Sequence, residues 1–383
     1  MPNNPQPTVA NRIGVVGAGQ LARMMGEAAH DLGVTLTVLA ASASDAAAAT
    51  CDATVFGEPT DESSLERLSS LVDVVTFDHE LVDPDQIAEL ESRGVVVRPN
   101  AHALRFAIDK AHQRTSFRAA GFPVPKFLVT RTPGDEVERF LDDVGPVVIK
   151  AARGGYDGRG VLFPATRAEV RSLIEELSPT VDVVIEERLA LRGELAQIVV
   201  RGTGGECVTY PLVTTVQSDG MCVEVCFPAH VAPETDREAA RLSLAIAEFT
   251  GAVGVVAIEY FLTARGLLVN EIALRPHNSG HWTIEGARTS QFTNHLRAVS
   301  GRSLESSEPV VDAAVMVNVV GSVAPGSLDD ARNVPGAYVH DYGKSWRPGR
   351  KLGHVTALGD DEHAVHVTAW ESARRYGTRT RET

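Results

Sequence analysis

The sequence predicts an α/β protein, α+β overall, that begins with a βαβ parallel-sheet domain. From Arg12 to about Pro99, apolar runs of strand length alternate with helical segments, which is the pattern of a parallel sheet with crossover helices. A second block, from about Asn100 to Gly301, contains further strands, a Gly-rich loop and a hairpin. A third block, from about Pro309 onward, is small and mixed. We therefore expect three domains.

The elements follow from these patterns in chain order. In the first block we expect a strand and glycine turn at 12–19, a helix at 20–33, a strand at 34–41, a helix at 63–72, a strand at 73–80, a helix at 83–94 and a final strand at 95–99. In the second, we expect one amphipathic helix at 103–120, then strands at 146–152, 181–188, 194–202, 206–216 and 221–229, with helices at 167–177, 238–251 and 290–300. In the third, we expect strands at 313–321 and 337–343, a basic turn at 344–355 and a charged tail.

Composition excludes several classes of protein. Of the 383 residues, 44% are hydrophobic and 22% charged, which is ordinary for a globular protein and unlike a disordered one. The net charge is −14 and there is no run of Lys or Arg, so nucleic acid and anionic membrane are poor partners. No apolar run reaches the ~18 residues of a membrane helix. We expect a cytoplasmic protein.

Two apolar strands, Ala257–Leu262 and Leu267–Ile272, each carry a glutamate among apolar neighbours. A three-residue loop ending at Gly266 would place Glu259 directly opposite Glu271, whereas a four-residue loop would put them on opposite faces. Opposed carboxylates repel unless a cation lies between them. Mg²⁺ bridging the phosphates of a nucleotide suits such a pair. The alternative is a hairpin with two solvated glutamates.

The first glycine cluster, Gly14 to Gly19, resembles a dinucleotide fingerprint that binds a phosphate at a helix N-terminus. The fingerprint also requires an acidic residue at the end of the second strand, but here the next acid is Asp45. An NAD-binding oxidoreductase is therefore disfavoured. A small anion on this helix and a purely structural turn both stay open.

Three further clusters carry cations beside flexible or polar residues. Lys150 ends a strand and is followed by the loop from Gly154 to Gly160, in which glycines and Arg159 favour a lid over nucleotide phosphates. Arg275, His277 and Asn278 come directly after the Glu271 strand and suit an anion site. The fourth cluster places Lys344, Arg347, Arg350 and Lys351 around a Pro-Gly turn, which favours local phosphate binding over an exposed loop only weakly.

Together these motifs resemble the ATP-grasp superfamily. The segments GGYDGRG, NEIALRPHNSGHWT and RPGRKLGHV are similar to the 5-(carboxyamino)imidazole ribonucleotide synthase family, from Arg12 through about Thr368. The resemblance implies an ATP-dependent ligase of purine biosynthesis that carboxylates aminoimidazole ribonucleotide with bicarbonate through carboxyphosphate. It also implies ATP and Mg²⁺ as cofactors and a homodimer as the assembly.

The resemblance further implies a role for each matching residue. The Mg²⁺ ligands would be Glu259 and Glu271. The bicarbonate and carboxyphosphate pocket would be lined by Arg275, His277 and Asn278, with Tyr156 and Arg159 also counted as catalytic. The nucleotide would contact Lys110, Lys150, the lid residues Gly155, Tyr156, Asp157, Gly158, Arg159 and Gly160, the hinge residues Glu186, Glu187, Arg188 and Leu189, and also Glu194, Gln217, Asn270 and Glu271. The ribonucleotide would contact Gln20, Leu21, Asp78, Glu80, Lys344, Arg350 and Lys351, together with Tyr156 and Arg159.

Three positions depart from the family pattern: Gln217 stands where a histidine is common, Leu274 replaces a proline, and Asp78 replaces a glutamate. These departures put nucleotide affinity and ribose contacts in question more than the reaction.

The competing functions are another ATP-grasp ligase, such as a glycinamide ribonucleotide transformylase or a biotin carboxylase, and a catalytically silent nucleotide-binding protein. The expected domains are 1–102, an ATP-grasp domain at 103–308 with a mobile lid at about 125–190, and 309–383.

Overall fold

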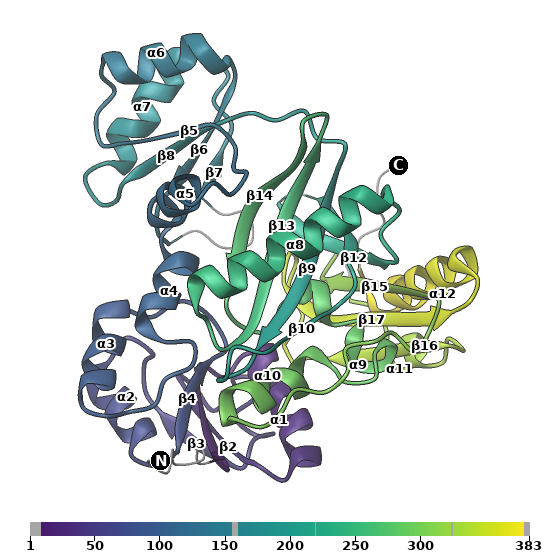
Figure 1. Ribbon diagram of the computed structural model, residues 1–383. Coiled ribbons are helices and arrows are strands. Elements are labelled where there is room, and N and C mark those ends of the chain that lie inside the picture. Colours follow the sequence, from purple (N-terminus) through teal and green to yellow (C-terminus); the bar gives the residue numbers. More distant parts are fainter. Residues whose placement is uncertain (1–8, 155–159, 219, 323–324, 379–383) are drawn as a thin grey trace, which may run out of the picture.

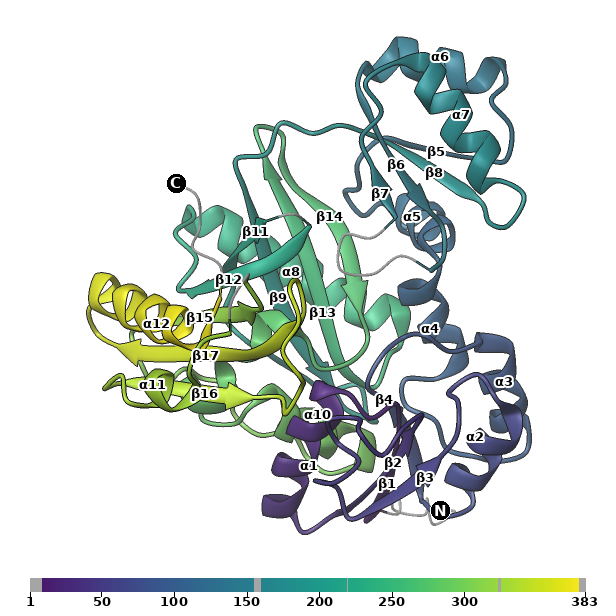
Figure 2. The same cartoon turned by 180° about the vertical axis from the view of Figure 1, so that it is seen from behind.

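The computed structural model describes residues 9–154, 160–218, 220–322 and 325–378. Figure 1 shows three sheets, with the N-terminal sheet at one end, a small lid of two helices on a sheet at the other, and a long central sheet between them. The view from behind in Figure 2 shows the last helices and strands of the chain against the far end of the central sheet. The α/β class and the order of the parts are as predicted.

The N-terminal sheet is parallel throughout, in the order β3-β2-β1-β4. This confirms the βαβ prediction, with two differences. The strand β3 was missed, and the expected last strand is reduced to one parallel bridge between Val75 and Val97, after which Pro99 has no N–H to extend the ladder. The elements are β1 (Arg12–Val16), α1 (Gln20–Leu32), β2 (Thr35–Ala40), β3 (Ala53–Phe56), α2 (Glu62–Ser69), β4 (Val74–Phe77) and α3 (Pro84–Ser92).

The single helix expected at 103–120 is wrong, because two helices, α4 (Ala101–Ile108) and α5 (Lys110–Ala119), occupy this segment. Asp109 separates them with extended backbone, and its carboxylate accepts the N–H of His112 at 2.9 Å. Aspartate favours such a capping position over a helix interior. The break places Lys110 in the first turn of α5.

The lid is an antiparallel sheet in the order β5-β8-β6-β7, covered by two helices. Val137 and Leu141 of one helix, with Val170 and Ile174 of the other, are buried against its inner face. These apolar positions recur at helical spacing, so the lid has a small core of its own. Its elements are β5 (Phe127–Thr130), α6 (Asp135–Val144), β6 (Val147–Ala151), β7 (Val161–Leu162), α7 (Arg167–Leu177) and β8 (Val183–Glu187).

The central sheet runs in the order β14-β13-β9-β11-β12-β15-β17-β16, with β10 also paired to β9. The strand expected at 206–216 is two strands, since Tyr210–Leu212 lie between β10 and β11. The elements are β9 (Gly193–Arg201), β10 (Cys207–Thr209), β11 (Val213–Ser218), β12 (Met221–Phe227), α8 (Pro233–Thr250), β13 (Gly254–Thr263), β14 (Gly266–Ala273), the 3₁₀ turn η1 (Asn278–Gly280), α9 (Thr283–Gly286) and α10 (Gln291–Ser300).

The C-terminal segment continues this sheet, because β15 pairs with β12. The expected charged tail is instead helix α12, whose N-terminus is capped by Asp361. Val365, Ala369, Trp370 and Ala373 of this helix are buried against β15 and β17. Charged residues between these apolar positions hid the helical period. The elements are β15 (Ala313–Val320), α11 (Leu328–Arg332), β16 (Ala337–Asp341), β17 (Lys351–Gly359) and α12 (Glu362–Tyr376).

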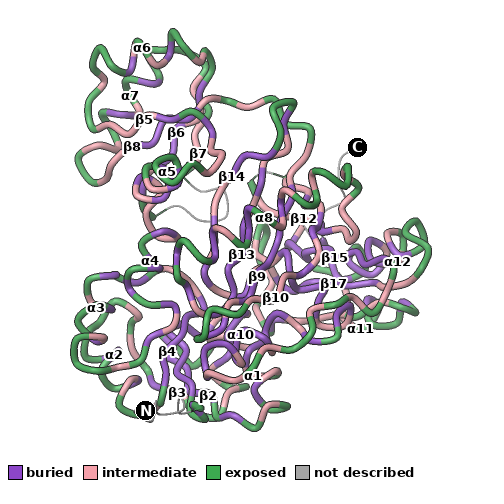
Figure 3. The backbone as a smooth tube through the Cα atoms, viewed as in Figure 1, coloured by how far each residue is buried: buried purple, intermediate pink, exposed green. Residues whose placement is uncertain are grey.

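Burial follows the strands of the N-terminal and central sheets, whereas the outer turns of the lid and of α12 are exposed (Figure 3). Within the described part of the chain, no helix is long and apolar enough to cross a membrane.

His295 on α10 joins the N-terminal sheet to the central sheet. Its Nδ1 accepts the N–H of Val255 on β13 at 3.0 Å, and its Nε2 lies 3.0 Å from Oγ1 of Thr76 on β4. Gly254 has φ +111°, and a Cβ at this position would lie 2.8 Å from the imidazole. Burial lowers the pKa of His295 to about 3, so the ring stays neutral.

We expect mild acid to destabilise the fold through His295. Its folded pKa lies below the ordinary value of about 6.5, so the unfolded chain binds the extra proton between these two values. The free energy of unfolding should fall as the pH drops below about 6.5, by up to about 1.4 kcal/mol per pH unit for this group. Urea unfolding between pH 7 and 5.5 measures the slope. His295→Gln should give a shallower slope, and equal slopes would contradict this account.

Candidate active site

The glutamate hairpin has the predicted pairing but a different turn. Thr263 pairs with Gly266, so only two residues form the turn, and this register alone would place Glu259 opposite Asn270. A β-bulge shifts the register at Asn270, so Glu259 pairs with Glu271 instead. The predicted opposition of the two carboxylates is therefore confirmed, and the bulge produces it.

A third carboxylate lies on the same face of the central sheet. Because Phe261 pairs with Glu194 on β9, and residues two apart on a strand share a face, Glu194 lies beside Glu259. Burial, and then the charges of Glu271 and Glu194, raise the pKa of Glu259. Burial and Glu271 likewise raise the pKa of Glu194. This face of the sheet therefore repels further negative charge unless a cation is present.

A lysine and a histidine approach the carboxylates from neighbouring elements. Nζ of Lys110, in the first turn of α5, lies 3.7 Å from Oε2 of Glu271. Nε2 of His277 lies 3.5 Å from Oε1 of Glu259. Both distances are longer than the ~2.7–2.9 Å of a strong charge-assisted hydrogen bond, and the His277 contact is an ion pair only when the imidazole is protonated.

Lys150 enters the site from the lid. Its Nζ lies 2.8 Å from Oε2 of Glu186 on β8, and it also donates to Oδ1 of Asn270 at 3.4 Å. Glu186 is bound on its other side by Nε of Arg114 at 2.6 Å. Burial alone would raise the pKa of Glu186, but the charges of Arg114 and Lys150 outweigh it and lower the pKa to about 2. The Glu186 carboxylate is thus a buried counter-ion beneath the predicted nucleotide hinge.

The rest of the predicted hinge is more exposed. Oε1 of Glu187 accepts bonds from the N–H of Lys126 at 2.8 Å and from Nη2 of Arg265 at 2.7 Å. Arg188 lies over the ring of Phe163, and Leu189 follows β8 without regular structure. Gly155, Tyr156, Asp157, Gly158 and Arg159 lie outside the described residues, and Gly160 has φ +85°.

The segment after β14 folds over the carboxylate face. Nε of Arg275 donates to Oε2 of Glu80 at 2.6 Å, which joins the segment to the N-terminal domain. The N–H and C=O of His277 are both bonded by the amide of Gln291, at 2.8 and 2.6 Å. Nδ2 of Asn278 is buried, and among the described residues it has no hydrogen-bond partner.

The predicted ribonucleotide residues come together from both ends of the chain. Nζ of Lys344 donates to Oε1 of Gln20 at 2.6 Å across 324 positions of sequence. The side chain of Leu21 is buried in the N-terminal core, which leaves its backbone for a ligand. Nη1 of Arg350 donates to Oγ of Ser345 at 2.8 Å, within the same loop. The charge of Lys351 lowers the pKa of Glu259 against the larger effects that raise it.

Asp78 holds the first glycine loop. Its carboxylate accepts the N–H of Gly19 at 2.7 Å and the N–H of Ala22 at 2.7 Å, so it caps the N-terminus of α1. A Cβ at Gly19 would lie 2.5 Å from this carboxylate. The anion at the N-terminus of α1 is therefore the carboxylate of Asp78.

Gln217, which stands where the family commonly has a histidine, lies at a second irregularity in strand pairing. Gln217 follows a register shift in the pairing of β11 with β12 and lies opposite Cys222. The departure at Leu274 places a buried side chain in the core, while its N–H donates to Oε1 of Glu80 at 3.2 Å. A proline could not make that bond.

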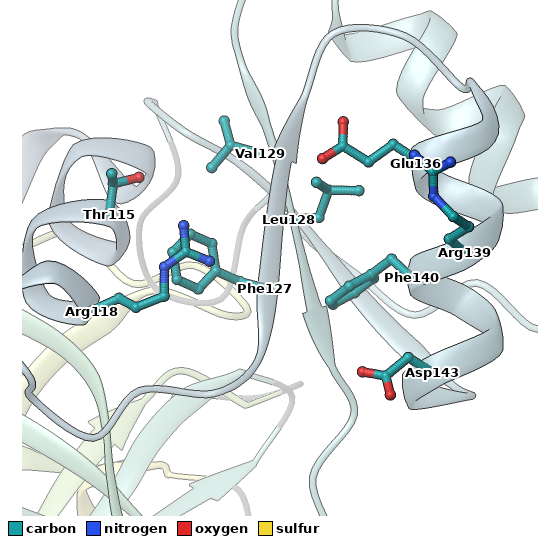
Figure 4. A pocket seen from close by; sticks show the side chains of 9 residues that line it. All are labelled: Thr115, Arg118, Phe127, Leu128, Val129, Glu136, Arg139, Phe140 and Asp143. Carbon is teal, nitrogen blue, oxygen red and sulfur yellow. The ribbon is translucent and has the colours of Figure 1, made fainter.

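A cavity of about 530 Å³ lies elsewhere in the lid (Figure 4). It is bounded by α5, β5 and α6, and Arg118 stacks over the ring of Phe127 at 4.3 Å within it. None of its lining residues belongs to the predicted nucleotide or substrate set.

Comparisons with known proteins agree with this geometry. Three family models match in succession: a ribonucleotide synthetase preATP-grasp domain at residues 10–108, an ATP-grasp domain at 115–292, and a phosphoribosylaminoimidazole carboxylase C-terminal domain at 314–368. The chain is 46% identical to the N5-carboxyaminoimidazole ribonucleotide synthase of Mycobacterium tuberculosis, over 96% of this chain and 89% of the relative. This chain belongs to the N5-carboxyaminoimidazole ribonucleotide synthase family of ATP-grasp ligases.

Other members of the family extend the likeness. The synthase of Corynebacterium ammoniagenes is 39% identical over 96% of this chain and 92% of its own length. The structure of the Thermus thermophilus synthetase superposes with a TM-score of 0.88 at 34% identity, covering 97% of this chain and all of that one. The Aspergillus clavatus synthase, in complex with ADP and 5-aminoimidazole ribonucleotide, gives 0.86 at 30% identity, covering 96% and 99%.

The donor set fits the magnesium ion that ATP-grasp ligases use. Mg²⁺ takes oxygen ligands, keeps several waters, and is bound through one or two carboxylates plus substrate phosphates. Glu259 and Glu271 supply two such carboxylates, and a divalent cation would offset the burial and the repulsion that raise the pKa of Glu259. The remaining ligands would come from phosphate and water.

Sequence reasoning missed two residues of this site. Arg114 and Gln291 hold the predicted site residues without belonging to any glycine or glutamate motif. Only the helical spacing of Lys110 and Arg114, which places both on one face of α5, could have indicated the arginine.

We expect Glu271→Gln to stabilise the ligand-free protein while weakening its response to Mg·ADP. At pH 9, above the raised pKa of Glu259 of about 8, removing one of two opposed charges should raise the free energy of unfolding by about 0.5 kcal/mol. The same change removes a charged Mg²⁺ ligand, so Mg·ADP should raise Tm less than in the wild type. Thermal unfolding with and without Mg·ADP measures both effects. Glu175→Gln, on the exposed face of α7, is the control, and an undiminished Mg·ADP shift in Glu271→Gln would refute the metal assignment.

Proposed function

We propose that this chain carboxylates 5-aminoimidazole ribonucleotide with bicarbonate at the expense of ATP, giving 5-(carboxyamino)imidazole ribonucleotide, ADP and phosphate. The observation that carries the proposal is the pairing of Glu259 with Glu271 on a sheet face that Lys110 and Lys150 approach. The family to which the chain belongs supports the identity of the substrates.

The nucleotide would lie between the lid and the central sheet. Lys110 and Lys150 would bind its phosphates, and Asn270, Glu259 and Glu271 would hold the magnesium end. Glu194, whose pKa is raised by burial and by Glu271, would accept the ribose hydroxyls. The backbone of Glu187 to Leu189 would face the adenine, since the Glu186 side chain is engaged below it. Gln217 and the lid residues 155–160 complete the proposed set.

The bicarbonate would lie beside Arg275, His277 and Asn278. Arg275 supplies a guanidinium that is held in place by its ion pair with Glu80. Asn278 supplies a buried side-chain amide nitrogen that has no hydrogen-bond acceptor among the described residues. Tyr156 and Arg159 are proposed to close this pocket from the lid.

The ribonucleotide would bind between the N-terminal and C-terminal domains. Gln20 and Lys344 already meet there, and Arg350 and Lys351 lie on the same loop and strand as Lys344. Glu80 and Asp78 fix the neighbouring segments, Asp78 by capping α1 and Glu80 by holding Arg275. The contact of Leu21 would be made by its backbone.

The proposed reaction has two stages, the formation of carboxyphosphate and the carboxylation of the amine. A bicarbonate oxygen attacks the γ-phosphorus of ATP and releases ADP, and the resulting carboxyphosphate breaks into CO₂ and phosphate. The exocyclic amine of the ribonucleotide then adds to CO₂ and loses a proton to form the carbamate. Bound Mg²⁺ would neutralise charge on the transferring phosphate. Lys150 and Lys110 hold the phosphates in line, and closure of the lid excludes water from carboxyphosphate.

The NAD-dependent alternative is disfavoured by the first glycine loop. The N–H groups that would bind a pyrophosphate are already bonded to Asp78. A glycinamide ribonucleotide transformylase differs in both the acid that attacks ATP and the amine that accepts the acyl group, so it is distinguished by assay.

The family also supports a homodimer and a cytoplasmic location. Light scattering after gel filtration tests the first, and a mass equal to a single chain would refute it.

The decisive assay measures ADP release with Mg·ATP, aminoimidazole ribonucleotide and bicarbonate, omitting one component at a time. We expect turnover to require all three and to produce an acid-labile carbamate. Replacement of bicarbonate by formate should abolish product formation. ADP release that is independent of the ribonucleotide would refute the proposed acceptor.

We expect Lys344→Ala to weaken ribonucleotide binding selectively. Loss of one charge-assisted hydrogen bond to the ligand should raise the KM for the ribonucleotide by about 10- to 100-fold. The KM for ATP should stay within about twofold, because the nucleotide contacts are on other elements. Steady-state kinetics give both constants. Lys126→Ala removes a lid lysine paired with Asp143 and should leave both unchanged. A parallel rise in both constants for Lys344→Ala would contradict the assignment.

A further inference from the structure

Arg114 on α5 is buried between the two sheets of the nucleotide site. Its side chain is 2% exposed, and each of its donor groups has a partner. Nε donates to Oε1 of Glu186 at 2.6 Å, Nη1 to Oε1 of Gln113 at 2.8 Å, and Nη2 to the carbonyl oxygen of Asn270 at 2.5 Å. A planar guanidinium can bind three acceptors in such a fixed arrangement, whereas an ammonium cannot.

These contacts form a closed ring across the domain boundary. Glu186 continues to Lys150 at 2.8 Å, Lys150 continues to Oδ1 of Asn270 at 3.4 Å, and the backbone of Asn270 returns to Arg114. The ring joins β6 and β8 of the lid to β14 of the central sheet. Figures 1 and 2 both show α5 at the junction of these two parts.

The first consequence concerns charge. A buried carboxylate that loses its cation is strongly unfavourable, so Glu186 must always keep a partner. Without Arg114, only Lys150 could neutralise Glu186, and Lys150 could not turn toward a phosphate. With Arg114 in place, Glu186 keeps a full positive charge beside it when Lys150 moves away.

The second consequence concerns register. Asn270 is the extra residue of the bulge, and the bulge is what places Glu271 opposite Glu259. The backbone carbonyl of a bulged residue is left out of the regular ladder. Here that carbonyl accepts a charged hydrogen bond from Arg114, which favours the bulged register over the regular one.

We propose that Arg114 is a positioning residue that keeps Lys150 available to the nucleotide phosphates and fixes the bulge that opposes Glu259 and Glu271. This inference rests on the nucleotide site proposed above. Arg114 touches neither substrate nor metal in this role and acts through Glu186 and Asn270.

The test compares the wild type with a single and a double variant by equilibrium binding of Mg·ADP. In Arg114→Gln, Lys150 becomes the only counter-ion of Glu186, and the Kd should rise about 10- to 100-fold. In Arg114→Gln combined with Glu186→Gln, no carboxylate retains Lys150, and the Kd should recover by about tenfold. If Arg114 had a purely structural role, the affinity for Mg·ADP would not recover, and the double variant would bind no better than the single one.

A conservative variant separates the two consequences. Arg114→Lys keeps a charge beside Glu186 but cannot also reach the Asn270 carbonyl. We expect near-wild-type affinity for ADP at saturating Mg²⁺ and a several-fold higher Mg²⁺ concentration at half-saturation. Equal loss of ADP affinity in Arg114→Lys and Arg114→Gln would overturn the counter-ion role, and an unchanged Mg²⁺ requirement in Arg114→Lys would overturn the register role.

Arg118→Gln is the matched control, because Arg118 lies one turn along α5, is exposed, and stacks on Phe127 outside the ring. It should bind Mg·ADP like the wild type. Circular dichroism and thermal unfolding establish that each variant is folded. Wild-type protein that binds Mg·ADP but fails the carboxylation assay would overturn the proposed function while leaving the Arg114 comparison valid. An Arg114→Gln variant that is folded and binds Mg·ADP normally would overturn the inference.

Discussion

Two carboxylates held opposite each other on one sheet face repel, and much of the surrounding structure serves to hold them there. Glu259 and Glu271 face each other only because a bulge at Asn270 interrupts an otherwise regular hairpin. A regular ladder would relieve the repulsion by pairing Glu259 with Asn270. The bulge therefore has to be stabilised from outside the hairpin, and its carbonyl oxygen is bound by the buried guanidinium of Arg114.

The same arginine shares a carboxylate with a lysine of the lid. Lys150 and Arg114 share one buried carboxylate, so the pKa of Glu186 is held near 2, although burial alone would raise it. A shared carboxylate couples the position of the lid to the register of the central sheet, because Lys150 belongs to β6 and Asn270 to β14. The position of Lys150 and the register that opposes Glu259 and Glu271 thus depend on one set of contacts.

Sequence patterns predicted the elements whose periodicity is strong and missed those defined by single residues. The βαβ series and helix 167–177 follow from apolar spacing. The break at Asp109, the bulge at Asn270 and helix α12 do not, because each depends on a cap, an irregular pair or tertiary packing that spacing does not encode. The expected three-residue turn shows the same limit, since a two-residue turn with a bulge gives the same pairing.

The first glycine loop shows why a motif alone cannot identify a ligand. The N-terminus of a helix favours an anion, whether that anion is a phosphate or a side chain. Here the anion is Asp78, whose oxygens take the N–H groups of Gly19 and Ala22. Because those two donors are occupied, a ligand beside this loop has to use other groups, and the side chains of Gln20 and Lys344 are already in contact there. The glycine loop thus lies close to the C-terminal loop, and Asp78 occupies two of the N–H groups at the N-terminus of α1.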